Sequence, residues 1–169
     1  RAPFVYIENG RVADYDPKAP ISVSYIKNFE GEPTGKANPE LLTKLHPSHG
    51  HNQSIVNGIS RIGYMKGGGR ALWRDEDIAD SILSHAVRFI DSHRRSPFIM
   101  YLCTNDVHVP RMPHERFRGK SAMGLRGEAI LQFDWTVRQL TEALRARGLA
   151  RTTMLIITRD NGPVLDDGY

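Results

Sequence analysis

The sequence predicts an α/β fold with a mostly parallel sheet. Two stretches with helical periodicity, near residues 75–94 and 128–147, alternate with two short apolar runs at 98–103 and 152–158. Long connections separate these elements, as right-handed crossovers between parallel strands require. With 169 residues, 40% of them hydrophobic and 25% charged, the chain falls in the range of globular domains and can bury one sizeable core.

The N-terminal region, residues 1–74, is predicted to be rich in loops. Gly, Pro, Asn and Ser are frequent there, and two short apolar runs, residues 4–7 and 21–25, suggest only brief strands. That much irregular chain in a compact domain usually covers a binding face. We therefore expect residues 1–74 to lie over a functional face and residues 75–169 to form a core of helix, strand, helix and strand.

The first helix is expected to begin at Asp75, whose side chain can cap it, and to end near Arg94. Its apolar residues recur with the 3.6-residue period of a helix: Ile78, Ile82, Leu83, Ala86, Val87, Phe89 and Ile90. After Pro97, the apolar run 98–103 predicts a strand that is buried on both faces, as in a parallel sheet.

The second helix is expected between Glu128 and Arg147, with Gly148 placed to stop it. Its predicted apolar positions are Ile130, Leu131, Phe133, Trp135, Val137, Leu140 and Leu144. The run 152–158 then predicts a second buried strand. Because a helix connects the two runs, we expect 98–103 and 153–158 to be parallel strands of one sheet.

Composition favours an anionic partner and excludes several classes. The chain has 23 Lys and Arg against 19 Asp and Glu, a formal charge of +4. Its basic residues lie in small groups without interleaved aromatic residues, so no nucleic acid is expected. Cys103 is the single cysteine, which excludes an internal disulfide, and no run approaches the roughly 20 apolar residues of a membrane span. Because it begins at Arg1 and ends in a polar stretch, we expect an internal segment of a longer protein.

Polar tracts follow both apolar runs, where ligands bind in open α/β sheets. In the second tract, Asp160 and Asn161 offer a carboxylate and an amide oxygen side by side, and Gly162 permits a sharp bend. Oxygen donors of this kind suit a hard cation such as calcium or magnesium. A plain turn is the alternative, because Asp-Asn-Gly is also a favoured turn sequence.

The first tract, residues 104–111, contains His108 just before Val109 and Pro110. A histidine there could act as an acid, a base or an anion contact near neutral pH. The alternative is a loop histidine that is hydrogen-bonded to the backbone. If the two runs are parallel strands, His108 and Asp160 should face one cleft.

Taken together, these motifs resemble the sulfatase family, in particular its arylsulfatase A-like branch. The resemblance rests on Val107-His108-Val109-Pro110, on the Gly-rich bridge 119–127 with the following helix that bears Asp134, and on Asp160-Asn161-Gly162-Pro163. The resemblance depends on the order and spacing of these motifs along the chain. Upstream, residues 46–51 and 55–73 resemble the corresponding stretch of bacterial sulfatases.

The resemblance implies part of an alkaline-phosphatase-like α/β/α sandwich that cleaves sulfate esters with Ca²⁺ and a formylglycine nucleophile. It implies that Asp160 and Asn161 are calcium ligands and that His108 contacts the sulfate and helps to protonate the leaving oxygen. The implied substrate is a small sulfate ester or a sulfated glycan. The implied location is outside the cytoplasm: periplasmic, extracellular or lysosomal.

The chain also departs from the family pattern. Cys103 is followed by Thr104-Asn105-Asp106 and not by x-Pro-x-Arg, so it cannot be the formylglycine precursor and is predicted to be a buried strand residue. Asn105 stands where relatives often carry histidine, and Arg159 where they usually carry a small residue. Because the nucleophile motif has no counterpart, we expect the isolated chain to be inactive.

Weaker candidates and rival functions remain open. His49, His51 and Lys66 lie in loops that could cover a sulfate pocket, and Arg111 could help to bind a charged substrate. The rival enzyme is a phosphatase or phosphodiesterase of the same superfamily. The rival from another class is a non-catalytic protein that binds sulfated glycans.

Overall fold

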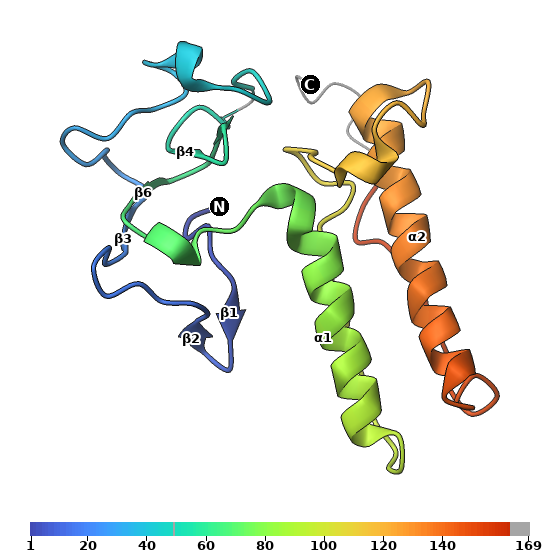
Figure 1. Ribbon diagram of the computed structural model, residues 1–169. Coiled ribbons are helices and arrows are strands. Elements are labelled where there is room, and N and C mark those ends of the chain that lie inside the picture. The colour runs from blue at the N-terminus through green and yellow to red at the C-terminus, as the bar shows by residue number, and fades with distance from the viewer. Residues whose placement is uncertain (49, 163–169) are drawn as a thin grey trace. The chain divides into compact units, whose positions relative to one another are not determined.

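The computed structural model describes residues 1–48 and 50–162. The described residues divide into two compact units, residues 1–74 and 75–162 (Figure 1). Each unit has its own hydrophobic core. The first unit is built from very short strands and loops, and the second from two long helices and two extended segments.

The strands of the first unit form three small antiparallel pairs. They are β1 (Ile7–Glu8) with β2 (Arg11–Val12), β3 (Ser22–Ser24) with β6 (Tyr64–Lys66), and β4 (Ile55–Val56) with β5 (Ile59–Ser60). Asn9-Gly10 and Asn57-Gly58 form the two tight turns, with positive φ at all four residues. Asn-Gly is the pair that such two-residue hairpin turns favour. The prediction of brief strands is confirmed near residues 7 and 22–24.

The core of the first unit lies where its N-terminal segment meets the second half of the unit. It consists of Ala2, Phe4, Val5, Val56, Met65 and Ala71. Trp73 packs against this cluster and meets the ring of Phe4 edge-on, with centroids 6.3 Å apart. Short 3₁₀ turns, η1 (Pro39–Leu41) and η2 (Gly69–Ala71), complete the unit.

The second unit contains both predicted helices. Helix α1 runs over Ile78–His93 after a 3₁₀ turn, η3 (Asp75–Asp77), so it starts three residues later than expected. Helix α2 runs over Gly124–Ala146 and starts four residues earlier. Its predicted stop is confirmed, since Gly148 has a φ of 71° that glycine adopts without strain. A further 3₁₀ turn, η4 (Glu115–Phe117), precedes α2.

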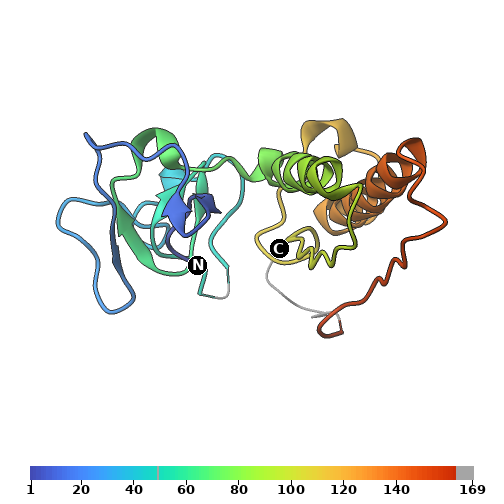
Figure 2. The same ribbon diagram turned by 90° about the horizontal axis from the view of Figure 1, so that it is seen from below.

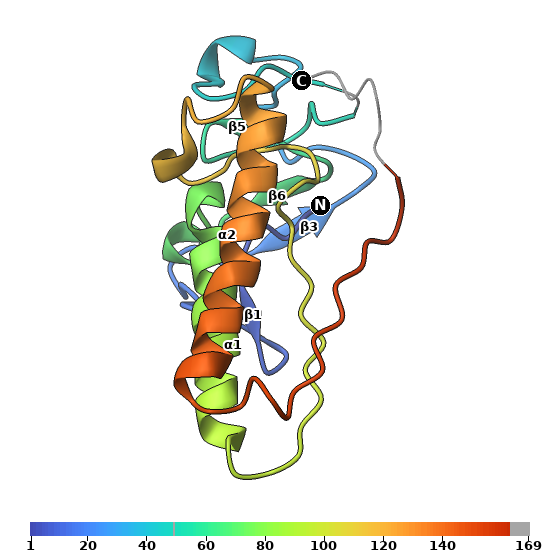
Figure 3. The ribbon, with the colours of Figure 1, turned by 90° about the vertical axis from the view of Figure 1, so that its right-hand side faces the viewer.

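Helices α1 and α2 run side by side in the same direction (Figures 1 and 3). Their contact is the core of the second unit, formed by Leu83, Ala86, Ile90, Leu140 and Leu144. At the C-terminal end of the pair, Nε and Nη2 of Arg147 each lie 2.7 Å from a carboxylate oxygen of Asp91. The helices thus form one layer with a fixed register.

The two predicted strands are extended but carry no strand pairing in the described residues. Segments 98–103 and 153–158 both run back toward the N-terminal end of α2, on one side of the helix pair (Figures 2 and 3). A strand needs hydrogen bonds to a neighbour, and the paired strands within residues 1–48 and 50–162 are all antiparallel. The predicted parallel sheet is therefore not present there.

The predicted burial of these segments on both faces is wrong in this structure. In segment 98–103, Phe98, Met100 and Leu102 pack on the helix core, whereas Ile99 and Tyr101 are 95% and 92% exposed. Cys103 is also exposed, which corrects its prediction as a buried residue. The alternation is that of a strand with one covered face.

The buried face of α2 also differs from the prediction. Ile130 and Leu131 are exposed, while Glu128, Gln132 and Thr136 are buried at four-residue intervals. Such spacing places the three on one stripe of the helix. The reason is that this stripe contacts a polar loop, residues 104–120, as well as the core.

No helix in the described parts of the chain has the length and apolar character that a bilayer span needs.

Candidate functional site

The loop from residue 104 to 120 connects the extended segment 98–103 to α2 and carries His108. The backbone N–H of His108 donates to the carbonyl of Asn105 over 3.1 Å, and its Nδ1 lies 2.6 Å from the carbonyl oxygen of Val109. The imidazole is exposed. The backbone contact of the alternative interpretation is therefore present, and it also orients the ring.

This contact fixes which ring nitrogen can meet a ligand. A carbonyl oxygen only accepts, so Nδ1 carries a proton when it bonds to Val109. Nε2 is then the nitrogen left for another partner. It accepts a hydrogen bond in the neutral ring and donates one in the imidazolium.

Arg111 lies in the same loop but is buried, at 8% exposure. Its Nε donates to the carbonyl of Val107 over 3.1 Å. The side chain therefore braces the backbone on the N-terminal side of His108. The structure brings these two predicted residues into one loop, with Arg111 in a bracing position.

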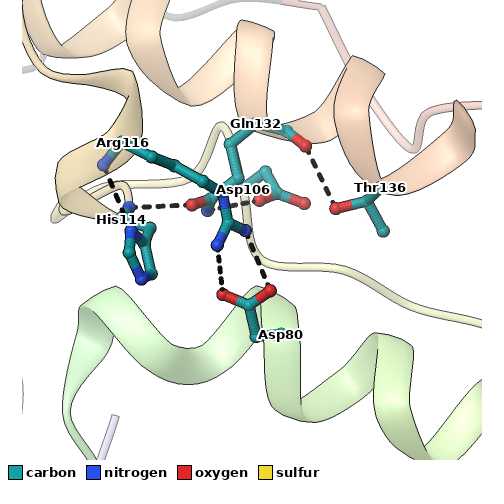
Figure 4. Close-up of polar contacts among 6 residues, drawn as sticks. All are labelled: Asp80, Asp106, His114, Arg116, Gln132 and Thr136. Carbon is teal, nitrogen blue, oxygen red and sulfur yellow. Dashed lines mark hydrogen bonds and ion pairs between the residues drawn. The ribbon is translucent and has the colours of Figure 1, made fainter. Parts of the chain in front are cut away.

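Within this loop, Gln132 of α2 joins the two ends of a shorter loop, residues 106–114, which contains His108 and is called the His108 loop below. Its Nε2 donates to Oδ1 of Asp106 over 2.7 Å, and its Oε1 accepts from the backbone N–H of His114 over 2.8 Å (Figure 4). Thr136 donates to the carbonyl of Gln132 from one turn further along the helix. One side-chain amide thus closes the base of a loop that begins at residue 106 and ends at residue 114.

Burial raises the pKa of Asp106, and hydrogen bonds from Gln132 and Thr104 oppose that rise. Its second carboxylate oxygen, Oδ2, is buried without a hydrogen-bond partner. A buried carboxylate without full compensation favours its protonated form. Oδ1 accepts the hydrogen bond from Gln132 whether or not Oδ2 carries a proton.

Three further contacts anchor residues 115–120, which follow the His108 loop and precede α2. The backbone N–H of Gly119 donates to Oε1 of buried Glu128 over 2.8 Å. Arg116 donates from Nη1 and Nη2 to the two carboxylate oxygens of Asp80 on α1, at 2.9 Å each (Figure 4). Its guanidinium also lies 3.9 Å from the centre of the Trp135 ring. The loop 104–120 is therefore tied to both helices.

Asp160 and Asn161 form a local turn at the end of the second extended segment. The backbone N–H of Asn161 donates to Oδ1 of Asp160 over 3.0 Å, and Nδ2 of Asn161 donates to the carbonyl of Gly162 over 2.7 Å. Oδ2 of Asp160 and Oδ1 of Asn161 take no part in these bonds. Both side chains are exposed, so the pair could present oxygen donors to a hard cation.

Two donors do not complete a calcium site, which takes six to eight oxygen ligands. Among residues 1–48 and 50–162, no group of three or more His, Cys, Asp or Glu side chains could hold a metal ion. Asp166 and Asp167, which follow this turn in the sequence, lie outside the described residues. The donor chemistry fits calcium, and further ligands must come from water or from other parts of the protein.

Tyr101 is the residue of the first extended segment whose pKa is shifted. The pKa of Tyr101 is raised mainly by its hydrogen bond with Cys103 and by the negative charge of Cys103. The negative charge of Asp160 adds a smaller rise. That segment leads directly into the loop 104–120.

Two other predicted binding residues, His51 and Lys66, belong to the first unit. His51 is buried, and its carbonyl accepts a hydrogen bond from the hydroxyl of Ser60. Lys66 is the exposed last residue of β6, where it pairs with Ser22. His49 lies outside the described residues. The structure places His51 and Lys66 in a different unit from His108.

The sequence prediction missed Asp106, Gln132 and Glu128. The available signal was the four-residue spacing of Glu128, Gln132 and Thr136, which sets three polar residues on one stripe of α2. A buried polar stripe needs partners, and these partners come from the loop 104–120.

Comparison with known proteins gives a consistent match. The family model described as Sulfatase matches residues 18–169. An N-acetylgalactosamine-6-O-sulfatase of Bacteroides thetaiotaomicron is 55% identical over 169 residues, which is 100% of this chain and 33% of that protein. Arylsulfatase H of Canis lupus familiaris is 34% identical over 93 residues, covering 55% of this chain and 16% of that protein.

A solved structure agrees with the sequence match. It comes from work on the metabolism of multiple glycosaminoglycans by Bacteroides thetaiotaomicron. The match has a TM-score of 0.95 and 54% identity, and it covers 99% of this chain and 35% of the other. The chain thus spans about a third of the length of the bacterial proteins it matches.

Proposed function

The chain belongs to the sulfatase family, and from this premise we propose that it supplies part of the active site of a calcium-dependent sulfate-ester hydrolase. The observation that carries the proposal is the braced His108 loop, which leaves one imidazole nitrogen available to a ligand. The turn at Asp160 and Asn161 ends the neighbouring extended segment. In the complete protein, the predicted parallel sheet and α/β/α sandwich would bring both to one edge.

The proposed substrate is a sugar that carries a sulfate ester at a primary hydroxyl. The support is the 55% identity to a protein named as an N-acetylgalactosamine-6-O-sulfatase. The formal charge of +4 also suits an anionic glycan.

His108 would act at the leaving oxygen. With Nδ1 bound to Val109, the imidazolium presents Nε2–H, which can first contact a sulfate oxygen. As the bond between sulfur and the sugar oxygen breaks, Nε2 donates its proton to that oxygen, and the neutral ring remains. Proton donation of this kind matters most when the leaving group is a basic alkoxide.

Asp160 and Asn161 would hold calcium through Oδ2 and Oδ1, respectively. Bound calcium supplies positive charge that stabilises the sulfate oxygens in the transition state. The nucleophile is expected elsewhere in the protein, because no Cys or Ser in this chain begins the required x-Pro-x-Arg pattern. We also propose that the complete protein is exported, as the family resemblance implies, which cell fractionation with an antibody would test.

A chimera tests this function without the rest of the protein. Residues 1–169 would replace the matching third of the Bacteroides thetaiotaomicron relative, which the 55% identity makes feasible. We expect calcium-dependent release of sulfate from N-acetylgalactosamine 6-sulfate. A folded chimera that cleaves only phosphate esters would support the phosphatase alternative, and one that binds sulfated glycan without turnover would support the non-catalytic alternative.

A further inference from the structure

We propose that Gln132 is a positioning residue that sets His108 for proton transfer by holding both ends of its loop. The inference rests on the proposed function of His108. Gln132 lies on α2 and contacts Asp106 and His114, which lie at the two ends of the loop. Its side-chain hydrogen bonds go to Asp106 and His114 and not to the imidazole of His108, so its effect on the reaction would be indirect.

The geometry leaves the amide little freedom. Its oxygen must face the N–H of His114, because that group only donates, and its nitrogen then faces Oδ1 of Asp106 (Figure 4). The side chain is 3% exposed and Asp106 is 6% exposed. Buried hydrogen bonds of this kind are costly to break, because the separated donor and acceptor cannot form replacement hydrogen bonds with water.

Gln132 contacts the His108 loop but lies outside the contact between the two helices, so loop placement and helix packing can be tested separately. The contact between α1 and α2 is formed by Leu83, Ala86 and Ile90 against Leu140 and Leu144, which lie two to three turns beyond Gln132 on α2. Removing the amide should therefore loosen the loop while the helix pair stays folded. Gln139, which hydrogen-bonds to Glu142 on an exposed part of α2, offers a matched control.

A charge swap makes the test specific. In Gln132→Glu the new carboxylate would face Asp106, and the two groups could stay close only by sharing a proton. Combining Gln132→Glu with Asp106→Asn restores one donor and one acceptor, in reversed order. The other charged or titratable groups around this junction are Glu128 on α2, His114 and Arg116 on the loop 104–120, and Asp80 on α1. All four are unchanged in every variant.

The experiment compares the parent chimera with four variants of it. They are Gln132→Leu, Gln132→Glu, the double variant Gln132→Glu with Asp106→Asn, and the control Gln139→Leu. Activity is measured on the sugar 6-sulfate and on an aryl sulfate with an acidic phenol, across pH. Amide hydrogen exchange of residues 105–115 reports loop order independently of activity.

We expect Gln132→Leu to lower kcat on the sugar sulfate by about tenfold or more, as misplacement of a catalytic group does, with a smaller loss on the aryl sulfate. Gln132→Glu should lose kcat increasingly as pH rises, and the double variant should recover it. Exchange in the loop should rise in the two single variants at position 132 and not in Gln139→Leu.

Two results would overturn the inference: unchanged exchange in the loop of Gln132→Leu, or equal losses of kcat on both substrates. Failure of the double variant to recover activity would also count against it. An inactive parent chimera would instead count against the proposed function, and the exchange data would still test the role of Gln132 in holding the loop.

Discussion

Nε2 of Gln132 donates to Oδ1 of Asp106 over 2.7 Å, and both side chains are buried between α2 and the loop that carries His108. The bond ties the loop to the helix layer, so its strength can be measured as stability. Asp106→Ala should lower the free energy of unfolding by about 1 to 3 kcal/mol, because it leaves the Gln132 amide without its buried acceptor. Asp106→Asn keeps an acceptor and should cost much less. Urea denaturation of the chimera checks both, and equal losses would contradict the prediction.

The pH dependence of stability should also change in Asp106→Asn. Burial raises the pKa of Asp106 in the folded state, so the folded protein holds this proton more tightly than the unfolded chain. The wild type should therefore lose stability as pH rises from the unfolded pKa through the raised folded pKa. The variant lacks that loss. Denaturation curves at a series of acidic to neutral pH values measure the difference in the free energy of unfolding between the wild type and Asp106→Asn. The contribution of the Asp106 proton to this difference should shrink toward low pH.

Asp91 should show the opposite sign. Its hydrogen bond with Arg147 lowers the pKa of Asp91, so its contribution is present above the unfolded pKa and is lost as pH falls through the lowered folded pKa. Asp91→Asn should therefore reduce stability near neutral pH and leave it unchanged at strongly acidic pH. The effect should be small and sensitive to salt, because the pair is exposed. Thermal melts at low and high salt test this, with Asp134→Asn on α2 as the control.

His108→Ala should impair turnover according to the leaving group. If His108 protonates the departing oxygen, kcat of the chimera on the sugar sulfate should fall by about 10²- to 10⁴-fold. The loss should be much smaller on an aryl sulfate whose phenolate leaves without a proton. His85→Ala, which removes an exposed histidine of α1, is the control. An equal effect on both substrates would assign His108 to sulfate binding alone.

Asp160→Ala should raise the calcium concentration that the chimera needs for activity, by roughly tenfold or more, since it removes a charged ligand. The 169-residue chain alone should bind calcium weakly in titration calorimetry, and it should not hydrolyse aryl sulfates. Asp134→Ala serves as the carboxylate control. Tight calcium binding by the isolated chain would mean that other residues of this chain complete the site.

Sequence periodicity located the helices well because their apolar faces pack on each other. Leu83, Ile90, Leu140 and Leu144 follow the 3.6-residue period, and all four are in the α1–α2 core. The same rule failed at Ile130 and Leu131, which are exposed, and at Gln132, which is buried. Hydrophobicity does not reveal that a polar loop will cover part of a helix, because the partners of that loop are distant in sequence.

The strands and the candidate site were predicted less completely for a related reason. An apolar run in the sequence predicts an extended backbone, but strand pairing also depends on a neighbouring segment. Segments 98–103 and 153–158 have no paired neighbour in the described residues. Position also could not be derived for His51 and Lys66, which belong to the other unit. His108 and Asp160 stay predictions as acid and ligand. What the structure adds is the bracing by Arg111 and Gln132, which no local motif encodes.

The one-sided packing of segment 98–103 and the exposure of segment 153–158 bear on how the chain can be handled. Ile99 is 95% exposed, Met154 85% and Ile156 75%, and both segments are extended with unpaired edges. Apolar edges of this type recruit further strands, from other copies if nothing else is present. Made alone at high concentration, the chain should precipitate or require a holdase chaperone, whereas co-production with the remaining two thirds of a family member should keep it in solution.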